Sequence, residues 1–141
     1  MNKYLPAMLM LFTTMASADC LNDIKSGNDL IQSNICTYQN TVLAKIDSVS
    51  LDGWYNPATY FKPHRIYNYS ATVQEIYKGT TNTKMCFFQW REGSFSNMES
   101  MVGVNYIISF NNNYGCSLID VGGMLPANKE LIQIARQHGA K

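Results

Sequence analysis

The chain has 141 residues, of which 46% are hydrophobic and 15% charged, and its formal net charge is +1. This length supports one domain with a moderate core. Basic and acidic residues are nearly equal in number, and the basic ones form no stripe. The sequence therefore argues against a nucleic-acid partner, because phosphate backbones are bound by clustered Lys and Arg.

The first 18 residues have the pattern of an export signal. Lys3 gives a positive start, Leu5–Met15 is an apolar run, and Ala16–Ala18 is a cleavage site of small residues. The apolar run is too short for a membrane-spanning helix, which needs roughly 20 residues. We therefore expect residues 1–18 to be removed. Residues 19–141 should then form a single domain, periplasmic or secreted, without membrane insertion.

Four cysteines lie in the expected mature chain. An even number of cysteines in a small exported domain indicates two disulfides, and four cysteines allow three pairings that the sequence does not distinguish. A metal site is disfavoured, because no Cys-x-x-Cys spacing is present and both histidines are far from any cysteine. We expect no metal and no other cofactor. The disulfide-forming residues are Cys20, Cys36, Cys86 and Cys116.

The first half of the mature chain predicts a helix, a strand and a long connection. Residues 20–35 carry apolar side chains at helical spacing. Residues 41–50 alternate as a strand, and a β-bulge is expected near Val49, where the alternation breaks. Residues 51–65 contain two prolines and a glycine, which exclude regular structure over most of this connection.

The second strand, residues 66–77, leads into a Lys-Gly turn. Its alternation slips so that Ile76 continues the apolar set, which again indicates a bulge. The third strand, residues 84–90, has apolar residues on both faces and is expected to be covered on both sides. The apolar side chains that alternate inward along the first two strands are Val42, Ala44, Ile46, Tyr67, Tyr69, Ala71 and Val73.

The last third of the chain predicts two more strands and a closing helix. The strands cover residues 102–110 and 116–121, and two glycines end the second of them. The helix covers residues 128–138, with Asn128 as its N-cap. No helix lies between strands, which excludes parallel βαβ units. The prediction is an all-β fold with a helix at each end, built on a five-stranded Greek-key OB-fold barrel.

Three segments in this order resemble a known family. Cys36 precedes the strand Thr41–Ile46, Tyr69–Gly79 ends in a Lys-Gly turn, and Gly103–Phe110 is similar to a Gly-x-x-Tyr-Leu-Ile strand. Together they resemble the netrin-like domain, in particular the inhibitory domain of the tissue inhibitors of metalloproteinases and their bacterial relatives. The resemblance implies a domain that binds another protein and inhibits a protease or another enzyme. It also implies that Cys20 pairs with Cys116, and Cys36 with Cys86.

One feature of these inhibitors is missing. Their mature chain begins with Cys-x-Cys, and the first cysteine chelates the catalytic zinc of the target. Here the expected start is Asp19, Cys20, Leu21 and Asn22, with a single cysteine at the second position. We therefore expect binding by this terminal segment without zinc chelation, because a one-residue offset moves the terminal amine by about 3.5 Å.

The long connection is the second expected part of the binding surface. It holds Trp54, Tyr55, Tyr60 and Phe61, followed by His64. Aromatic side chains with polar tips dominate recognition surfaces. Two other interpretations are open. The rings could cover the barrel as part of its core, or they could be stacking platforms of a small-ligand or glycan-binding module.

The sequence does not predict an enzyme. No Gly-x-Ser-x-Gly, His-Glu-x-x-His or glycine-rich phosphate loop is present. His64 lies in the proline-rich connection, and His138 lies in the last turn of the closing helix, where a surface position favoured by the helix dipole is the simpler explanation. No set of convergent catalytic residues is expected.

Overall fold

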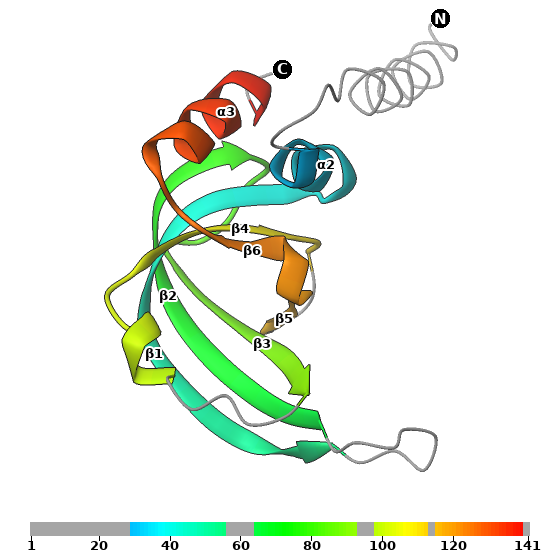
Figure 1. The fold of residues 1–141 in the computed structure, drawn as a ribbon, viewed down its shortest axis with the longest axis vertical. Helices are drawn as coiled ribbons and strands as arrows, with labels where there is room; N and C mark the ends of the chain where they lie inside the picture. The colour runs from blue at the N-terminus through cyan, green and yellow to red at the C-terminus, as the bar shows by residue number, and fades with distance from the viewer. Residues whose placement is uncertain (1–28, 56–63, 93–97, 113–114, 140–141) are drawn as a thin grey trace, which may run out of the picture.

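The computed structural model describes residues 29–55, 64–92, 98–112 and 115–139. The predicted export signal and the start of the predicted mature domain lie outside these ranges. The described chain is mostly β and forms one curled sheet, a half-barrel, with two helices beside one end (Figure 1).

The sheet has six strands in the order β5-β3-β2-β1-β4-β6. Neighbouring strands pair antiparallel, except that β5 runs parallel to β3. In chain order the elements are α2 (Asp29–Thr37), β1 (Asn40–Tyr55), β2 (His64–Lys78), β3 (Lys84–Glu92), the 3-10 helix η1 (Met98–Met101), β4 (Asn105–Phe110), β5 (Ser117–Leu118), the 3-10 helix η2 (Val121–Gly123), β6 (Met124–Pro126) and α3 (Lys129–Gly139).

The predicted five-stranded Greek-key barrel is not confirmed. The predicted fifth strand is reduced to Ser117–Leu118, and a sixth strand, Met124–Pro126, follows the two glycines and pairs with β4. The sequence predicts the end of strand structure at these glycines. In the fold they allow a 3-10 turn that redirects the chain from one side of the half-barrel to the other.

The hairpin of β1 and β2 is longer than expected. Its register continues to the pair Tyr55 and His64, so the prediction of irregular structure over 51–65 was wrong at both ends. The physical reason is the position of the prolines: Pro57 and Pro63 lie between the two strands, where they remove no hydrogen bond from the ladder.

Bulges curl this hairpin. The register shifts at four points, one of which places Asp47 as an extra residue between Ile46 and Ser48. That bulge turns Val49 back toward the core, as its broken alternation predicted. On β2 the predicted bulge is also present, because Val73 pairs with Ala44 and Glu75 with Leu43, which leaves Gln74 as an extra residue. Ile76 then pairs with Val42 of the larger core, but at this end of the strand its side chain stays 45% exposed.

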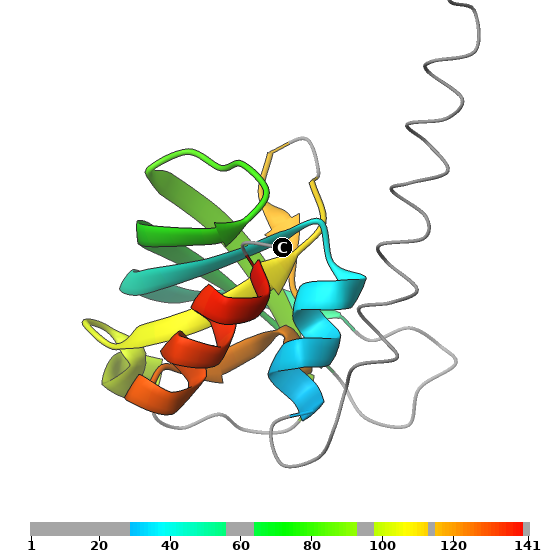
Figure 2. The same ribbon diagram turned by 90° about the horizontal axis from the view of Figure 1, so that it is seen from above.

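The molecule has two hydrophobic cores. The larger core fills the half-barrel and contains the predicted inward residues, with Val73 packed at its margin. The smaller core lies between the sheet and the two helices, which run side by side in Figure 2. The smaller core consists of Ile31, Ile35, Leu43, Tyr77, Ile107 and Ala135.

The Tyr-Lys-Gly turn joins these parts. Tyr77 is 6% exposed and packs in the smaller core, and its burial raises its pKa to about 12. Lys78 Nζ donates hydrogen bonds to the carbonyl oxygens of Ile35 and Tyr38, at the C-terminal end of α2, where a cation is favoured by the helix dipole. Gly79 has a φ of 80° and passes close to Asn40. Each residue of the turn therefore has a structural function.

Candidate functional site

The structure describes only part of the predicted binding surface. Asp19–Asn22, Tyr60 and Phe61 lie outside the described residues. Trp54 and Tyr55 end β1, His64 begins β2, and the backbones of Tyr55 and His64 pair directly. The hairpin thus brings these three predicted residues to one end of the sheet. His138 lies elsewhere, on α3, with its Nε2 atom 3.4 Å from Gln32 Nε2.

The disulfide pairing differs from that implied by the resemblance. Cys86 is bonded to Cys116, with their Cα atoms 4.8 Å apart, which excludes both expected pairs. The reason is the parallel pairing of β5 with β3, which places Ser117 beside Phe87 and hence the preceding cysteine beside Cys86. Cys36 is also disulfide-bonded, and none of the described cysteines is free. These bonds are consistent with an oxidising compartment.

An apolar patch lies on the outer face of the half-barrel, and we call it the outer strip. It consists of Ile66, Phe88, Trp90 and Leu118. Ile66 pairs with Trp90, and Phe88 pairs with Leu118, so these side chains share one face across three strands. Trp90 is 43% exposed and Leu118 is 41% exposed. The prediction that β3 is covered on both sides was therefore wrong for this face.

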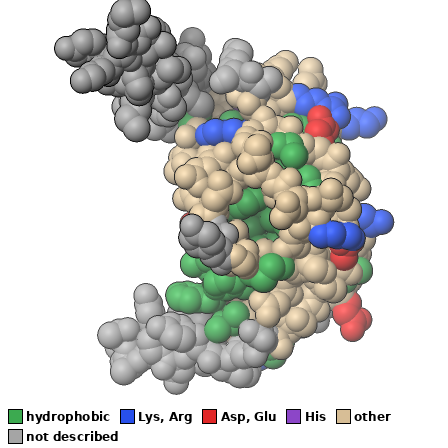
Figure 3. Space-filling view, turned by 180° about the vertical axis from the view of Figure 1, so that it is seen from behind, with side chains coloured by type: hydrophobic (Ala, Val, Ile, Leu, Met, Phe, Trp, Pro, Cys, Tyr) green, Lys and Arg blue, Asp and Glu red, His purple; other side chains and the backbone are tan. Residues whose placement is uncertain are grey.

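Neutral polar side chains border the outer strip. Asn68 pairs with Phe88 and Ser50, and Ser70 pairs with Ser48, its hydroxyl 2.5 Å from that of Ser48. Figure 3 shows hydrophobic side chains gathered on the side of the molecule seen from behind, with acidic and basic ones along its margin. Among the described residues, the side of the border formed by Ser48, Ser50, Asn68 and Ser70 therefore adds polarity without adding charge.

Charges on this face are found toward the start of β3. Lys84 Nζ lies 3.2 Å from Asp47 Oδ2, and the Thr72 hydroxyl donates to the same oxygen at 2.6 Å. The Thr72 hydroxyl, followed by the ammonium of Lys84, lowers the pKa of the Asp47 carboxyl. The charged groups of this cluster thus neutralise one another.

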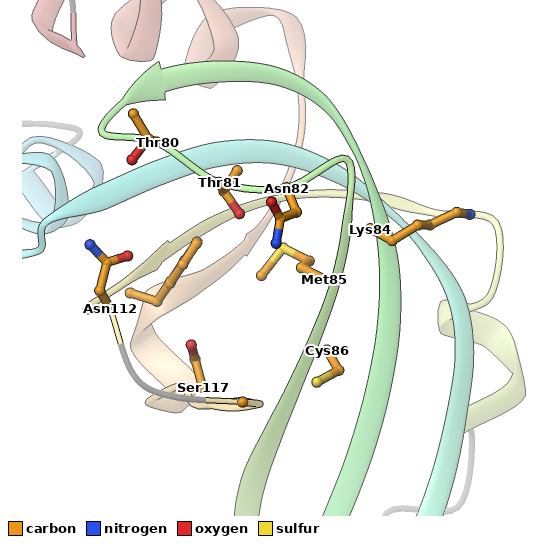
Figure 4. Close-up of a pocket in the computed structure, with 10 residues that line it drawn as sticks. Thr80, Thr81, Asn82, Lys84, Met85, Cys86, Asn112 and Ser117 are labelled. Atoms are coloured by element: carbon orange, nitrogen blue, oxygen red, sulfur yellow. The ribbon is translucent and has the colours of Figure 1, made fainter.

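A cleft of ≈ 480 Å³ opens between the start of β3 and the end of β4, which do not pair with each other (Figure 4). One wall is the turn between β2 and β3, and the other follows β4 and leads into β5. Its lining residues are Thr80, Thr81, Asn82, Lys84, Met85, Cys86, Phe110, Asn112, Gly115 and Ser117.

Asn40 fixes the two walls of the cleft relative to each other. This side chain is 1% exposed. Its Oδ1 accepts a hydrogen bond from the Thr80 backbone at 3.1 Å, and its Nδ2 donates to Asn112 Oδ1 at 2.7 Å. The Asn112 backbone also donates to Gln39 Oε1 at 2.8 Å. The two walls of the cleft are therefore joined by hydrogen bonds from a buried side chain.

Buried polar groups line the inner face of the half-barrel. Gln89 is 0% exposed, and its Oε1 accepts hydrogen bonds from the Arg91 guanidinium at 3.3 and 3.1 Å. The Tyr69 ring stacks on Phe87 with centroids 4.6 Å apart. Burial raises the pKa of Tyr69, and the nearby Arg91 partly offsets this. Within the described chain, Tyr69 Oη and Gln89 Nε2 have no well-formed hydrogen bond.

Sequence reasoning found only part of these sites. The alternation of Phe88 and Trp90 is visible in the sequence, but it predicts that the face of the strand on which they lie is buried. The cleft has no sequence signal, because its walls meet through Asn40 and Asn112, which are 72 positions apart.

The described residues show neither a metal centre nor a membrane span. They contain no group of three or more His, Cys, Asp or Glu side chains placed to hold a metal ion. No helix among them is both long enough and apolar enough to cross a bilayer. In comparisons with known proteins, no family model matches the chain and no curated protein matches it.

Proposed function

We propose that this protein is an exported, non-enzymatic domain of the netrin-like type that docks onto another protein through the outer strip. The observation that carries this proposal is the exposure of Trp90 and Leu118 on a sheet face bordered by neutral Ser and Asn side chains. The centre of a protein–protein interface is depleted of charge and enriched in aromatic residues. The solvent-facing side of an antiparallel sheet ordinarily carries polar side chains that alternate with the apolar ones facing the core.

The frame under the outer strip favours binding. β3 lies between β2 and β5, and the Cys86–Cys116 disulfide ties β3 to the segment that carries Leu118. A surface that is already ordered loses little conformational entropy when a partner binds. Trp90 is thus presented on a rigid element, as residues that dominate binding energy usually are.

The predicted aromatic segment extends this surface. Gly53 pairs with Ile66, which in turn pairs with Trp90, so the end of β1 with Trp54 and Tyr55 continues the same part of the sheet. The proposed partner is an enzyme, a protease among others, that the domain inhibits in the periplasm or outside the cell. The resemblance to metalloproteinase inhibitors supports this choice of partner. The paired cysteines support the compartment.

Site-specific photo-crosslinking in the exporting cell tests the proposal. A photoreactive amino acid at Leu118 should capture one protein in a 1:1 adduct, whereas the same group at exposed Gln133 on α3 should not. Trp90→Ser should weaken binding of that protein by about 2 kcal/mol, which is roughly thirtyfold. Val102→Ser is the matched control, because Val102 is 46% exposed but lies outside the outer strip.

Three results would contradict the proposal. Equal capture from Leu118 and Gln133 would show that the outer strip has no preferred partner. A silent Trp90→Ser with a strong effect of Trp54→Ala would place binding at the end of the hairpin instead. Cross-links to a second copy of this chain would identify the outer strip as a homodimer interface.

A further inference from the structure

We propose that the cleft between the start of β3 and the end of β4 binds a neutral saccharide. This site is separate from the outer strip and does not depend on the protein–protein function proposed above. At ≈ 480 Å³ the cleft falls in the size range of small-molecule sites, which is about 300–1,000 Å³.

The first argument is the number of uncommitted polar side chains. Within the described chain, the side chains of Thr80, Thr81 and Asn82 make no hydrogen bonds, and Asn112 uses only its Oδ1 atom. The Ser117 hydroxyl adds a further donor and acceptor on the opposite wall. Hydroxyl and amide groups can each donate and accept, which matches the alternating requirements of sugar hydroxyls.

The second argument is charge. Lys84 is the only ionisable side chain among the described residues that line the cleft. Its ammonium extends away from the cleft in Figure 4 and bonds Asp47 and Thr72 instead. A carboxylate or phosphate ligand would find no free cation among the described lining residues, because Lys84 is already paired, and a basic ligand would find no carboxylate among them. The chemistry therefore selects a neutral ligand.

The third argument is the apolar part of the lining. Met85 extends into the cleft, and Phe110 contributes to its lining. One face of a sugar ring is made of C–H groups, which pack against apolar side chains while the hydroxyls bond to the walls. The cleft combines these two surfaces, as small-ligand sites usually do.

The fourth argument is preorganisation. Asn40 bonds both walls, and the disulfide at Cys86 holds the segment that carries Ser117. A ligand would not have to order these segments, so more of its interaction energy would appear as affinity.

The test is NMR titration of the mature protein with maltose, cellobiose and N,N′-diacetylchitobiose, with glucuronate and glucosamine as charged probes. At least one neutral disaccharide should shift the amide signals of Thr81, Asn82, Asn112 and Ser117, with a dissociation constant on the order of 1 mM. The charged probes should bind more weakly. The absence of shifts at these amides with all three neutral disaccharides would overturn the proposal, as would shifts that occur only with the charged probes or only at the outer strip.

Two nearly isosteric variants distinguish a binding role from a structural one. Asn112→Asp keeps the oxygen that accepts from Asn40 but removes the free Nδ2 donor, and Thr81→Val removes one hydroxyl. Each should reduce the affinity about two- to tenfold while leaving the rest of the spectrum unchanged. Thr83→Val, outside this cleft, should have no effect. Equal affinity in all three variants would refute the site, as would binding of a blocked dipeptide but none of the sugars.

Discussion

At the residue scale, Gly79 and Asn40 show how one contact constrains two turns. Gly79 has a φ of 80°, a conformation that L side chains rarely adopt, and it passes directly over the Asn40 amide. Asn40 uses that amide to bond Thr80 and Asn112. The small size of the glycine is therefore needed so that a buried hydrogen-bonding group can lie beneath the turn.

Gly79→Ala should destabilise the protein by about 3 kcal/mol or more. An added Cβ would overlap Asn40 Oδ1 and lie 2.6 Å from the Gln39 carbonyl oxygen, in addition to the backbone strain. Gly103→Ala is the matched control, because its φ is 82° but no atom lies within 4 Å of the added Cβ. It should cost only about 1–2 kcal/mol. Urea unfolding measures both, and equal losses would mean that the Asn40 contact is unimportant.

At the element scale, α3 is fastened to β2 by both packing and charge. Ala135 is fully buried against the sheet, and Gly139 lies so close to the Tyr77 backbone that an added Cβ would clash with the Tyr77 carbonyl oxygen. Arg136 bonds the Glu75 carboxylate with both Nε and Nη2, at 2.8 and 2.9 Å. The closing helix is thus held in one position along the strand.

The ion pair of Glu75 and Arg136 should make stability depend on acidity. The hydrogen bonds from Arg136 lower the pKa of Glu75 from its ordinary value of 4.5. The ion pair therefore contributes its full stabilisation of the folded protein above pH 4.5. This stabilisation is lost as the pH falls through the lowered pKa that Glu75 has in the folded state. We expect Glu75→Gln to remove this part of the loss of unfolding free energy at acid pH. Urea unfolding at a series of pH values measures it.

Asp47 provides the comparison for that experiment. The pKa of Asp47 is also lowered, through Thr72 and Lys84. The Glu75→Gln variant should therefore still lose part of its unfolding free energy at acid pH. Asp47→Asn should instead leave the Glu75 contribution intact. An unchanged pH profile in Glu75→Gln would show that the ion pair with Arg136 is too well solvated to contribute.

At the scale of the whole molecule, the sequence predicted what depends on local alternation. Val42, Ala44, Tyr67 and Tyr69 are buried as expected, because a period of two assigns one face of a strand to the core. The closing helix was also found, with Asn128 Oδ1 accepting the Leu131 backbone hydrogen bond as a helix cap.

The features that the sequence did not predict depend on distant parts of the chain. The pairing of Cys86 with Cys116 follows from the parallel register of β5 on β3, which no local pattern specifies. β6 follows from a turn at two glycines that equally suit the end of a sheet. The exposure of Trp90 depends on which face the rest of the chain leaves uncovered.

Removing the Cys86–Cys116 bond should lower the free energy of unfolding by about 3–4 kcal/mol. The bond joins residues 30 positions apart, and closing a loop of that length restricts the unfolded chain. Urea unfolding of the double Cys86→Ala, Cys116→Ala variant measures this loss. Titration of the denatured, unreduced parent protein should find no reactive thiol. A loss below about 1 kcal/mol would show that strain in the folded state cancels the entropic gain.

The same bond also determines the covalent connectivity of a nicked protein. It encloses β4 and η1 in a closed ring of chain between residues 86 and 116. A protease that cuts once within this ring opens the backbone but releases no fragment, since the two halves stay joined through sulfur. Such a molecule keeps its mass, apart from one added water, until a reductant separates it. In an oxidising compartment the protein would thereby remain in one piece after a first cut in this segment.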